Sequence, residues 1–219
     1  MKNNLYNKIK FIFDKSKNRT AIFFKKKISF KELDVKSDLI CSYLYKKLNP
    51  GDKICITSKK NKNVYFILFS CLKLGVSVTF LDRKSPQSRN DKIIATLKPK
   101  IIFTDSELKK NIGKNRSTKI NLNFYKKLKK NIFELKKFSN LASKIDNKNV
   151  AYTMFTSGST GIPKGVEISQ ENLINFVDWV KDEYNIQNND IFSNLNPLYF
   201  DNSVFDIYGS ILNGAGFIP

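Results

Sequence analysis

Residues 53–104 read KICITSKKNKNVYFILFSCLKLGVSVTFLDRKSPQSRNDKIIATLKPKIIFT. Short apolar runs in this stretch predict buried strands, at 53–57, 76–81 and 100–104. Helices are expected between them, at 63–74 and 89–97, with Gly75 able to close the first in the left-handed conformation and Pro99 following the second. A strand-helix-strand-helix-strand order is typical of a parallel sheet covered by helices, so this stretch predicts an α/β fold.

The alternation of helix and strand continues on both sides of this stretch. Upstream, Ser29 and Glu32 have the form of a capping box at the start of a helix that ends near the turn 49–52. Between 105 and 149, lysine pairs interrupt the few apolar residues, and this segment is predicted to be a solvated, irregular connection. Further downstream, strands are expected at 150–155, 166–168 and 191–195, helices at 169–184 and 203–212, and an incomplete strand at 215–218.

Length and composition fit a soluble globular protein. The chain has 219 residues, 41% of them hydrophobic, which is enough to bury a substantial core. It contains no apolar run long enough to span a membrane, and its N-terminus lacks the apolar core and cleavage site of a secretory signal. The expected compartment is therefore the cytoplasm.

Two residue types exclude classes of chemistry. The chain has no histidine, so it can form neither a Ser-His pair nor a histidine-bound metal site. Its three cysteines, Cys41, Cys55 and Cys71, lie in apolar segments and lack the spacing of a metal site. They are expected to act as small hydrophobic side chains, and no metal site made of side chains is predicted.

The net charge of +20 belongs to the N-terminal part of the chain. Residues 1–149 carry 37 basic and 11 acidic side chains, whereas residues 150–219 carry 2 basic and 8 acidic ones. Only four of the 39 basic residues are arginine, the side chain whose planar fork reads bases and phosphates with paired hydrogen bonds. The lysine excess is interpreted as a solvated surface, and no nucleic-acid partner is predicted.

One loop concentrates residue types that bind phosphate. It runs Thr156-Ser157-Gly158-Ser159-Thr160-Gly161-Ile162-Pro163-Lys164-Gly165, between the strands expected at 150 and 166. Glycines let backbone amides approach an anion, hydroxyls add donors and Lys164 adds a positive charge, so the loop is predicted to cradle a polyphosphate. It is not a Walker loop, because Lys164 is followed by glycine. The residues alone also fit a flexible surface loop.

The stretch from Met154 to Val166 closely resembles the phosphate-loop signature of the adenylate-forming (AMP-binding) superfamily, which includes acyl-CoA synthetases, luciferases and amino-acid adenylation domains. Further matches follow in the family's order, at 28–33, 50–52, 72–75, 81–82 and 86–89. The resemblance implies that residues 1–219 form the N-terminal part of the family's large domain, with mainly parallel sheets flanked by helices. It also implies ATP and Mg²⁺ as cofactors, with the ATP phosphates bound by Thr156, Ser157, Gly158, Ser159, Thr160, Gly161 and Lys164.

The branch of the superfamily depends on Phe200-Asp201-Asn202-Ser203. In amino-acid-activating members the aspartate of this motif pairs with the α-ammonium of the substrate, and the resemblance gives this role to Asp201. The alternative is that Asp201 only caps the helix expected to begin at Ser203. The wider stretch 200–208, with 176–179 upstream, looks most like D-alanine:D-alanyl carrier protein ligases, followed by adenylation domains of nonribosomal peptide synthetases.

The reaction implied by this resemblance has two steps. An amino acid, D-alanine among the candidates, reacts with ATP to give an aminoacyl-adenylate and pyrophosphate. The aminoacyl group then passes to the phosphopantetheine thiol of a carrier protein. The resemblance identifies no catalytic side chain within these 219 residues, because the family's catalytic lysine belongs to a small C-terminal domain.

The chain also departs from the family's pattern. Family members are more than twice as long, so the C-terminal half of the large domain and the small domain are expected to be absent or supplied by a separate C-terminal polypeptide. This absence is expected to leave an exposed apolar surface at Ile207, Ile211 and Phe217. Phe80 stands where the family usually has proline, a change expected to alter local packing only.

Two alternative functions stay open. The first is an acyl or aryl-acid (acyl-CoA) ligase of the same fold, which has no ammonium to bind and so no need of Asp201. The second is a catalytically inactive fragment that acts as a binding or interaction module.

Overall fold

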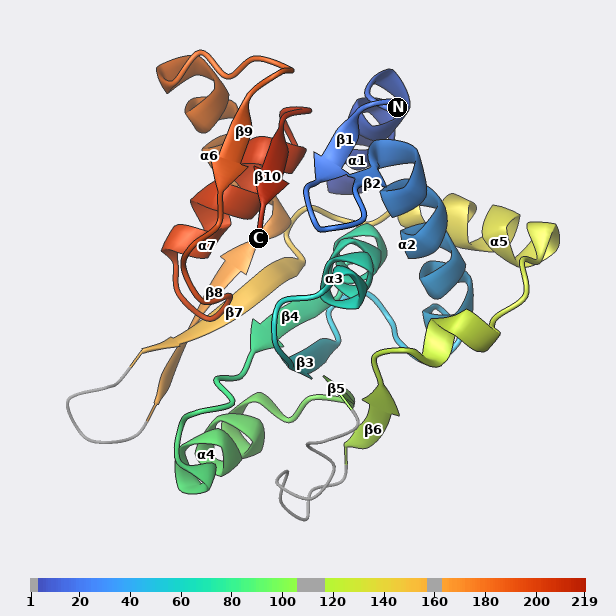
Figure 1. Ribbon diagram of the computed structural model, residues 1–219. Helices are drawn as coiled ribbons and strands as arrows, with labels where there is room; N and C mark the ends of the chain where they lie inside the picture. The colour runs from blue at the N-terminus through green and yellow to red at the C-terminus, as the bar shows by residue number, and fades with distance from the viewer. Residues whose placement is uncertain (1–3, 106–116, 157–162) are drawn as a thin grey trace.

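The computed structural model describes residues 4–105, 117–156 and 163–219 (Figure 1). Its helices are α1 (Leu5–Lys15), α2 (Phe30–Leu44), α3 (Lys62–Leu74), α4 (Gln87–Leu97), α5 (Ile132–Ala142), α6 (Gln170–Glu183) and α7 (Asn202–Val204), with the 3-10 helix η2 (Phe124–Lys127) and the π-helix η3 (Phe205–Gly209). Its strands are β1 (Thr20–Ile22), β2 (Ile28–Ser29), β3 (Lys53–Thr57), β4 (Ser77–Phe80), β5 (Ile101–Thr104), β6 (Thr118–Asn121), β7 (Val150–Thr156), β8 (Lys164–Ser169), β9 (Ile191–Ser193) and β10 (Gly216–Ile218). Across these described ranges, no helix combines the length and the apolar character that crossing a membrane requires.

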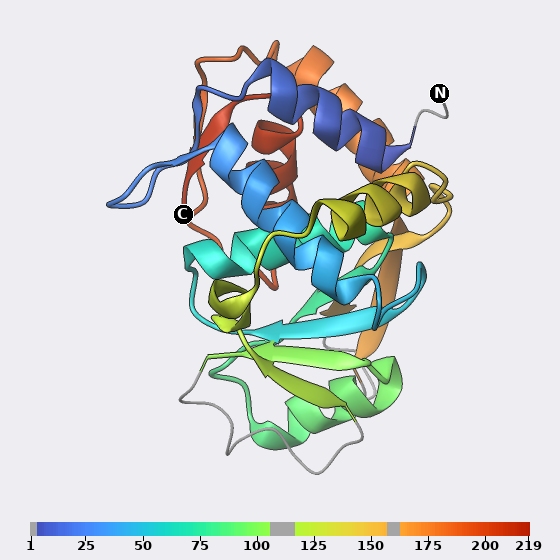
Figure 2. The same ribbon diagram turned by 90° about the vertical axis from the view of Figure 1, so that its right-hand side faces the viewer.

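Two mostly parallel sheets organise the described chain. The larger has the strand order β6-β5-β3-β4-β7-β8, and only β8 runs antiparallel to its neighbour. The smaller has the order β2-β1-β10-β9, with β2 antiparallel to β1. In Figures 1 and 2, α2 and α3 cover one face of the larger sheet and α4 covers the other. The predicted α/β class, with parallel sheets flanked by helices, is confirmed.

Helix α3 lies at the centre of the core, and every residue from Asn63 to Leu74 is buried. Its aromatic side chains contact three separate parts of the chain. Tyr65 packs on Phe217 of β10, Phe66 on Tyr125 of η2 and Phe69 on Phe13 of α1, with ring centroids 5.1–5.8 Å apart. The helix ends as predicted at Gly75, whose φ of +65° is readily accessible to glycine.

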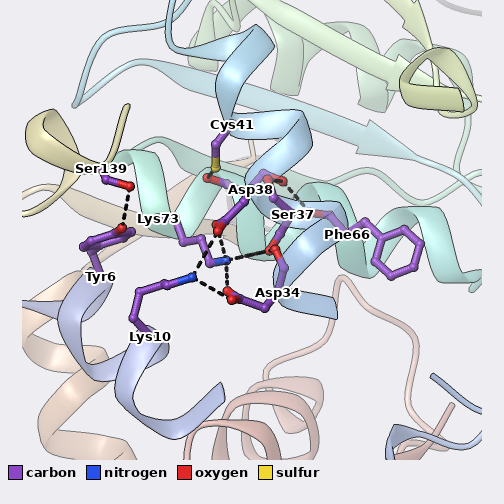
Figure 3. Close-up of polar contacts among 10 residues, drawn as sticks. Tyr6, Lys10, Asp34, Ser37, Asp38, Cys41, Phe66, Lys73 and Ser139 are labelled. Carbon is purple, nitrogen blue, oxygen red and sulfur yellow. Dashed lines mark hydrogen bonds and ion pairs between the residues drawn. The ribbon is translucent and has the colours of Figure 1, made fainter. Parts of the chain in front are cut away.

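A buried ionic cluster joins α1, α2 and α3 (Figure 3). The side chain of Lys73 on α3 is fully buried, and its Nζ lies 2.7 Å from carboxylate oxygens of both Asp34 and Asp38 on α2. The hydroxyl of Ser37 accepts a third hydrogen bond from the same Nζ at 2.7 Å. Lys10 of α1 binds the same two carboxylates from the other side, at 2.6 and 3.0 Å. All three charges that surround Lys73 therefore belong to one network.

The charges of this cluster set the protonation states within it. Burial by itself would raise the pKa of Asp34, but the positive charges of Lys73 and Lys10 together outweigh it and hold that pKa below its usual value. Burial opposes the charge on Lys73, yet Asp38 and Asp34 raise the pKa of its amine above the usual value. Asp34 and Lys73 are thus both ionised at neutral pH.

Two segments differ from the sequence expectations. Residues 117–149 are not an irregular connection, because they form β6, η2 and α5, and α5 buries Phe138 and Ala142 against the core.

Helix α1, which was not predicted, begins at the cap Asn4, whose side-chain amide also donates to the carbonyl oxygens of Ala142 and Ile145. Segments far apart in sequence thus supply these contacts.

The prediction of an exposed apolar surface at the C-terminal end, made by Ile207, Ile211 and Phe217, is wrong. Ile207, Ile211 and Phe217 are all buried. Phe217 packs on Tyr65, and β10 lies between β1 and β9, so the Phe217 side chain is covered by the described residues themselves, whereas the following Ile218 is half exposed. The helix predicted at 203–212 is present, but its middle adopts the π-helical form over Phe205–Gly209.

We expect replacement of Lys73 by Met to lower the free energy of unfolding by about 3–5 kcal/mol, since it leaves two carboxylates facing a core with one cation fewer. Lys10→Met is the matched control, because the Lys10 side chain is 34% exposed and solvent can replace its charge. Its loss should be about 1 kcal/mol or less. Urea denaturation measures both, and equal losses would contradict a special role for Lys73.

Lowering the pH should reduce the stability that the ionic cluster contributes, because it protonates the Asp34 carboxylate. Since the folded-state pKa of Asp34 lies below its usual value of 3.8, its contribution to stability is complete above that pH and is lost as the pH falls through the folded value. The Asp34→Asn variant should therefore be less stable at neutral pH and show a shallower loss below about pH 4. Urea titrations between neutral pH and pH 3 test this, and parallel curves for the two proteins would refute it.

Candidate functional site

The candidate site is a pocket of about 520 Å³ at the carboxyl ends of β4 and β7. These strands are parallel neighbours, so their C-terminal ends meet at one edge of the sheet, where α/β proteins bind ligands. The pocket is bounded by the ends of both strands, the segment that follows β4 and the turn before α7. Its lining residues are Phe80, Asp82, Ser85, Arg89, Asn90, Ile93, Met154, Phe155, Thr156, Tyr199, Phe200 and Asp201.

The predicted phosphate loop connects the strands of the β7–β8 hairpin. Thr156 ends β7 and lines the pocket, and Lys164 begins β8 directly opposite it in the ladder. The hydroxyl of Thr156 lies 3.5 Å from the carbonyl oxygen of Lys164, a long hydrogen bond. Among the other residues predicted to bind phosphate, Ser157, Gly158, Ser159, Thr160 and Gly161 lie outside the described residues. The strands expected at 150–155 and 166–168 are therefore present, and they pair with each other in this hairpin.

Asp201 lines the pocket at the start of α7. Its carboxylate accepts a hydrogen bond from the backbone N–H of Asn202 at 2.9 Å, so the capping alternative is seen in the structure. The hydroxyl of the buried Ser203 donates to the carbonyl oxygens of Phe200 and Leu198, at 2.6 and 3.2 Å. The serine of the Phe-Asp-x-Ser motif thus holds the turn that presents Asp201.

The charge of Asp201 also reaches β7. Burial, and after it the negative charge of Asp201, raises the pKa of Tyr152 to about 12. The Tyr152 ring stacks on Tyr208 of η3, with centroids 5.9 Å apart and planes 16° from parallel. This stack connects the strand that carries Thr156 to the helix that follows Asp201.

The third wall follows β4 and holds site residues that sequence reasoning did not single out. Asp82 accepts hydrogen bonds from the Lys84 N–H and the Ser85 hydroxyl, both at 2.9 Å. Partial burial and the neighbouring Asp82 carboxylate raise the pKa of Tyr199, which links this wall to the turn before α7. The side-chain amide of Asn90 donates to the carbonyl oxygen of Asp82 at 2.9 Å, and its side-chain oxygen is buried with no hydrogen-bond partner among the described residues.

Phe80 also belongs to this wall. It was expected to affect local packing only, yet its ring both packs against the core and lines the pocket. The sequence did contain a signal for this wall, since residues 81–82 and 86–89 resemble motifs of the superfamily. The resemblance did not, however, give a role to any side chain in these motifs.

The pocket contains polar groups of opposite character. In the part of the chain that the structure describes, no group of three His, Cys, Asp or Glu side chains could hold a metal ion. The pocket instead offers a hydroxyl from Thr156, a guanidinium from Arg89 and a carboxylate from Asp201. Donors for an anion and an acceptor for a cation therefore face one cavity.

Comparison with known proteins identifies the family. The profile described as "AMP-binding enzyme" matches residues 12–219. The chain belongs to the AMP-binding enzyme family. It is 31% identical to the D-alanine--D-alanyl carrier protein ligase of Listeria welshimeri over 196 residues, which are 88% of this chain and 38% of that ligase. It is 30% identical to the L-proline--[L-prolyl-carrier protein] ligase of Pseudomonas fluorescens, over 75% of this chain and 34% of that protein.

The fold agrees with this family. The crystal structure of the nonribosomal peptide synthetase FmoA3 superposes with a TM-score of 0.82 and 20% identity, covering 98% of this chain and 22% of that one. The chain thus has the fold of the N-terminal part of adenylate-forming ligases and spans between about a third and two fifths of the length of the curated AMP-binding relatives.

Gly165 provides a test of how the hairpin shapes the pocket. A Cβ atom at this position would lie 3.0 Å from the Phe155 ring and 3.1 Å from the Thr153 methyl group. Because Phe155 lines the pocket, Gly165→Ala should move its ring and cost about 1–3 kcal/mol of stability. The control Val166→Ala alters an exposed neighbour and should cost less than about 1 kcal/mol. Urea denaturation compares them, and an unaltered Gly165→Ala protein would contradict the close contact.

Proposed function

We propose that this chain contributes the phosphate- and substrate-binding parts of an AMP-forming ligase that activates an amino acid for a carrier protein. D-alanine is the first candidate, since ligases named for it are about 30% identical to this chain. The product would be an aminoacyl-adenylate, and the acceptor would be the phosphopantetheine thiol of the carrier. Residues 1–219 would form the N-terminal part of the adenylation domain.

The observation that supports this proposal most directly is that Thr156 and Asp201 line one pocket. They were selected from motifs 45 residues apart in sequence and for opposite charges of ligand. An amino acid bound next to ATP presents this combination, a cationic ammonium close to anionic phosphates. A fatty or aryl acid would leave the Asp201 carboxylate without a cationic partner.

Each site residue then has a defined task. Thr156, Lys164 and the loop residues Ser157, Gly158, Ser159, Thr160 and Gly161 would bind the β- and γ-phosphates of ATP through hydroxyls, backbone amides and one ammonium. Mg²⁺ would be held mainly by the phosphates themselves and would neutralise their remaining charge. Asp201 would pair with the α-ammonium of the amino acid, a charge-assisted hydrogen bond that also selects against acids without an amine. Catalysis would then rest on positioning and electrostatic stabilisation.

The test is amino-acid-dependent exchange of pyrophosphate into ATP. Because the chain spans 38% of its curated D-alanine relative, the assay should use both the 219-residue chain and the natural gene product isolated from its source cells. We expect exchange with D-alanine or another amino acid in the natural product. A mass above that of this chain, or a tightly associated second polypeptide, would show which additional segments take part in the exchange.

Two variants assign the exchange to the proposed residues. Asp201→Asn keeps an oxygen that can accept the Asn202 N–H but removes the charge, so kcat/KM for the amino acid should fall about 100-fold with little change in KM for ATP. Lys164→Gln should instead raise KM for ATP about tenfold. Asp14→Asn removes an exposed carboxylate on α1 and should leave both values unchanged.

The alternatives predict different results in the same assay. An acyl or aryl-acid ligase would exchange pyrophosphate with a simple carboxylic acid, and the activity would survive Asp201→Asn. A catalytically inactive binding module would show no exchange with any acid, whether or not a C-terminal polypeptide is added. Either outcome would overturn the proposal of amino-acid activation.

A further inference from the structure

The first turn of α5 exposes two adjacent large apolar side chains. Ile132 is 65% exposed and Phe133 is 62% exposed, although side chains of this kind are usually covered. The opposite side of the helix is fixed to the protein, because Phe138 is buried and packs edge-on against Tyr6 of α1. Helix α5 therefore has a firmly held inner face and a free outer face that carries Phe133.

Six exposed lysines flank these two side chains in the sequence. Four of them precede the helix and two lie one turn after Phe133, at Lys126, Lys127, Lys129, Lys130, Lys136 and Lys137. Positions three and four residues apart share a helix face, so Lys136 and Lys137 lie on the face of Phe133. The Lys137 ammonium is 4.4 Å from the centroid of the Phe133 ring. We call Ile132, Phe133 and these six lysines the α5 surface.

The acid within this stretch does not neutralise the α5 surface. Glu134 points to α2, where it accepts a hydrogen bond from the Tyr45 hydroxyl and pairs with Lys46 at 3.0 Å. These contacts hold the pKa of Glu134 below its usual value, so the carboxylate stays ionised and engaged with α2. The outer face is left with positive charge around an apolar centre.

We propose that the α5 surface binds an anionic lipid bilayer, with Phe133 and Ile132 inserted at the level of the headgroups. Exposed apolar anchors surrounded by lysines are the features by which a surface helix associates with negatively charged lipid. The lysine stems can lie along the acyl boundary while their ammonium groups reach the lipid phosphates. The site would serve as a peripheral attachment, independent of the function proposed above.

The composition of the α5 surface favours lipid over a macromolecular partner. Protein interfaces are depleted of lysine and enriched in arginine, and nucleic-acid readers also favour arginine, yet residues 126–137 contain no arginine. The location of α5 in the molecule is also compatible with membrane attachment. Figure 1 shows α5 on the opposite side of the molecule from the β7–β8 hairpin, so a membrane bound to α5 would leave the pocket accessible.

Co-sedimentation with vesicles tests the proposal. The 219-residue chain should bind vesicles of equal parts phosphatidylglycerol and phosphatidylcholine, and should bind pure phosphatidylcholine at least about tenfold less. Raising the salt from about 0.05 to about 0.5 M should weaken the binding, because it screens the lysines. Absence of binding to the anionic vesicles at low salt would overturn the proposal.

Matched variants separate the α5 surface from the general positive charge of the protein. The double variant Ile132→Ser/Phe133→Ser should lower the partition coefficient about tenfold, whereas Phe11→Ser, at an equally exposed position on α1, should not. Lys136→Gln/Lys137→Gln should weaken binding more than Lys25→Gln/Lys26→Gln, which removes two exposed lysines elsewhere. Equal effects within either pair would show non-specific adhesion and refute the proposed surface.

A fluorescence experiment reports insertion directly. Trp179 is the only tryptophan, so Trp179→Phe combined with Phe133→Trp places a single reporter on the α5 surface. Its emission should shift to the blue on anionic vesicles and be quenched by brominated lipid. Sedimentation without either change would contradict insertion.

An acidic protein that binds the chain through Phe133, in the absence of any vesicle binding, would reassign the α5 surface to protein docking.

Discussion

One buried ammonium group constrains how the first three helices pack. Lys73 lies among apolar side chains on α3, where an unpaired charge would be strongly destabilising. Asp34 and Asp38 are one turn apart on α2 and both bind it, so α2 can lie on α3 in one register only. Lys10 binds the same carboxylates, which extends the constraint to α1. Any other packing of these helices would leave a charge in the core without its partner.

The position of α3 in turn determines where the candidate site lies. Phe217 of β10 packs on Tyr65, so the smaller sheet is placed against one side of α3, while β3 and β4 lie on another. The turn that carries Asp201 belongs to the chain between β9 and β10, and Thr156 belongs to β7, the neighbour of β4. The two predicted site residues come together because both sheets are packed against the same buried helix. The ionic cluster thus supports the pocket without contributing a side chain to it.

The sequence predicted the elements whose signals are local. The strand at 53–57 and the helix closed by Gly75 have a buried apolar run or a defined cap, and both are present. The strands expected at 150–155 and 166–168 are also present, as β7 and β8. Helix α5 was missed because its contacts are distant. It shows six lysines around its start and buries only Phe138 and Ala142, which are covered by α1 and α2. Asn4 binds carbonyl oxygens more than 130 residues away, and no local pattern contains that information.

The site was predicted only as far as short motifs define it. Thr156 and Asp201 could be named because each belongs to a motif, whereas Tyr199 and the unpartnered oxygen of Asn90 join them through folding. The structure also changes how the two readings of Asp201 relate. The sequence offers helix capping and ammonium binding as alternative roles for this residue. However, a carboxylate has about four lone-pair positions, and the Asn202 N–H uses one of them. Capping therefore orients Asp201 and leaves acceptor capacity directed at the pocket, so a structural role and ammonium binding are compatible in one residue.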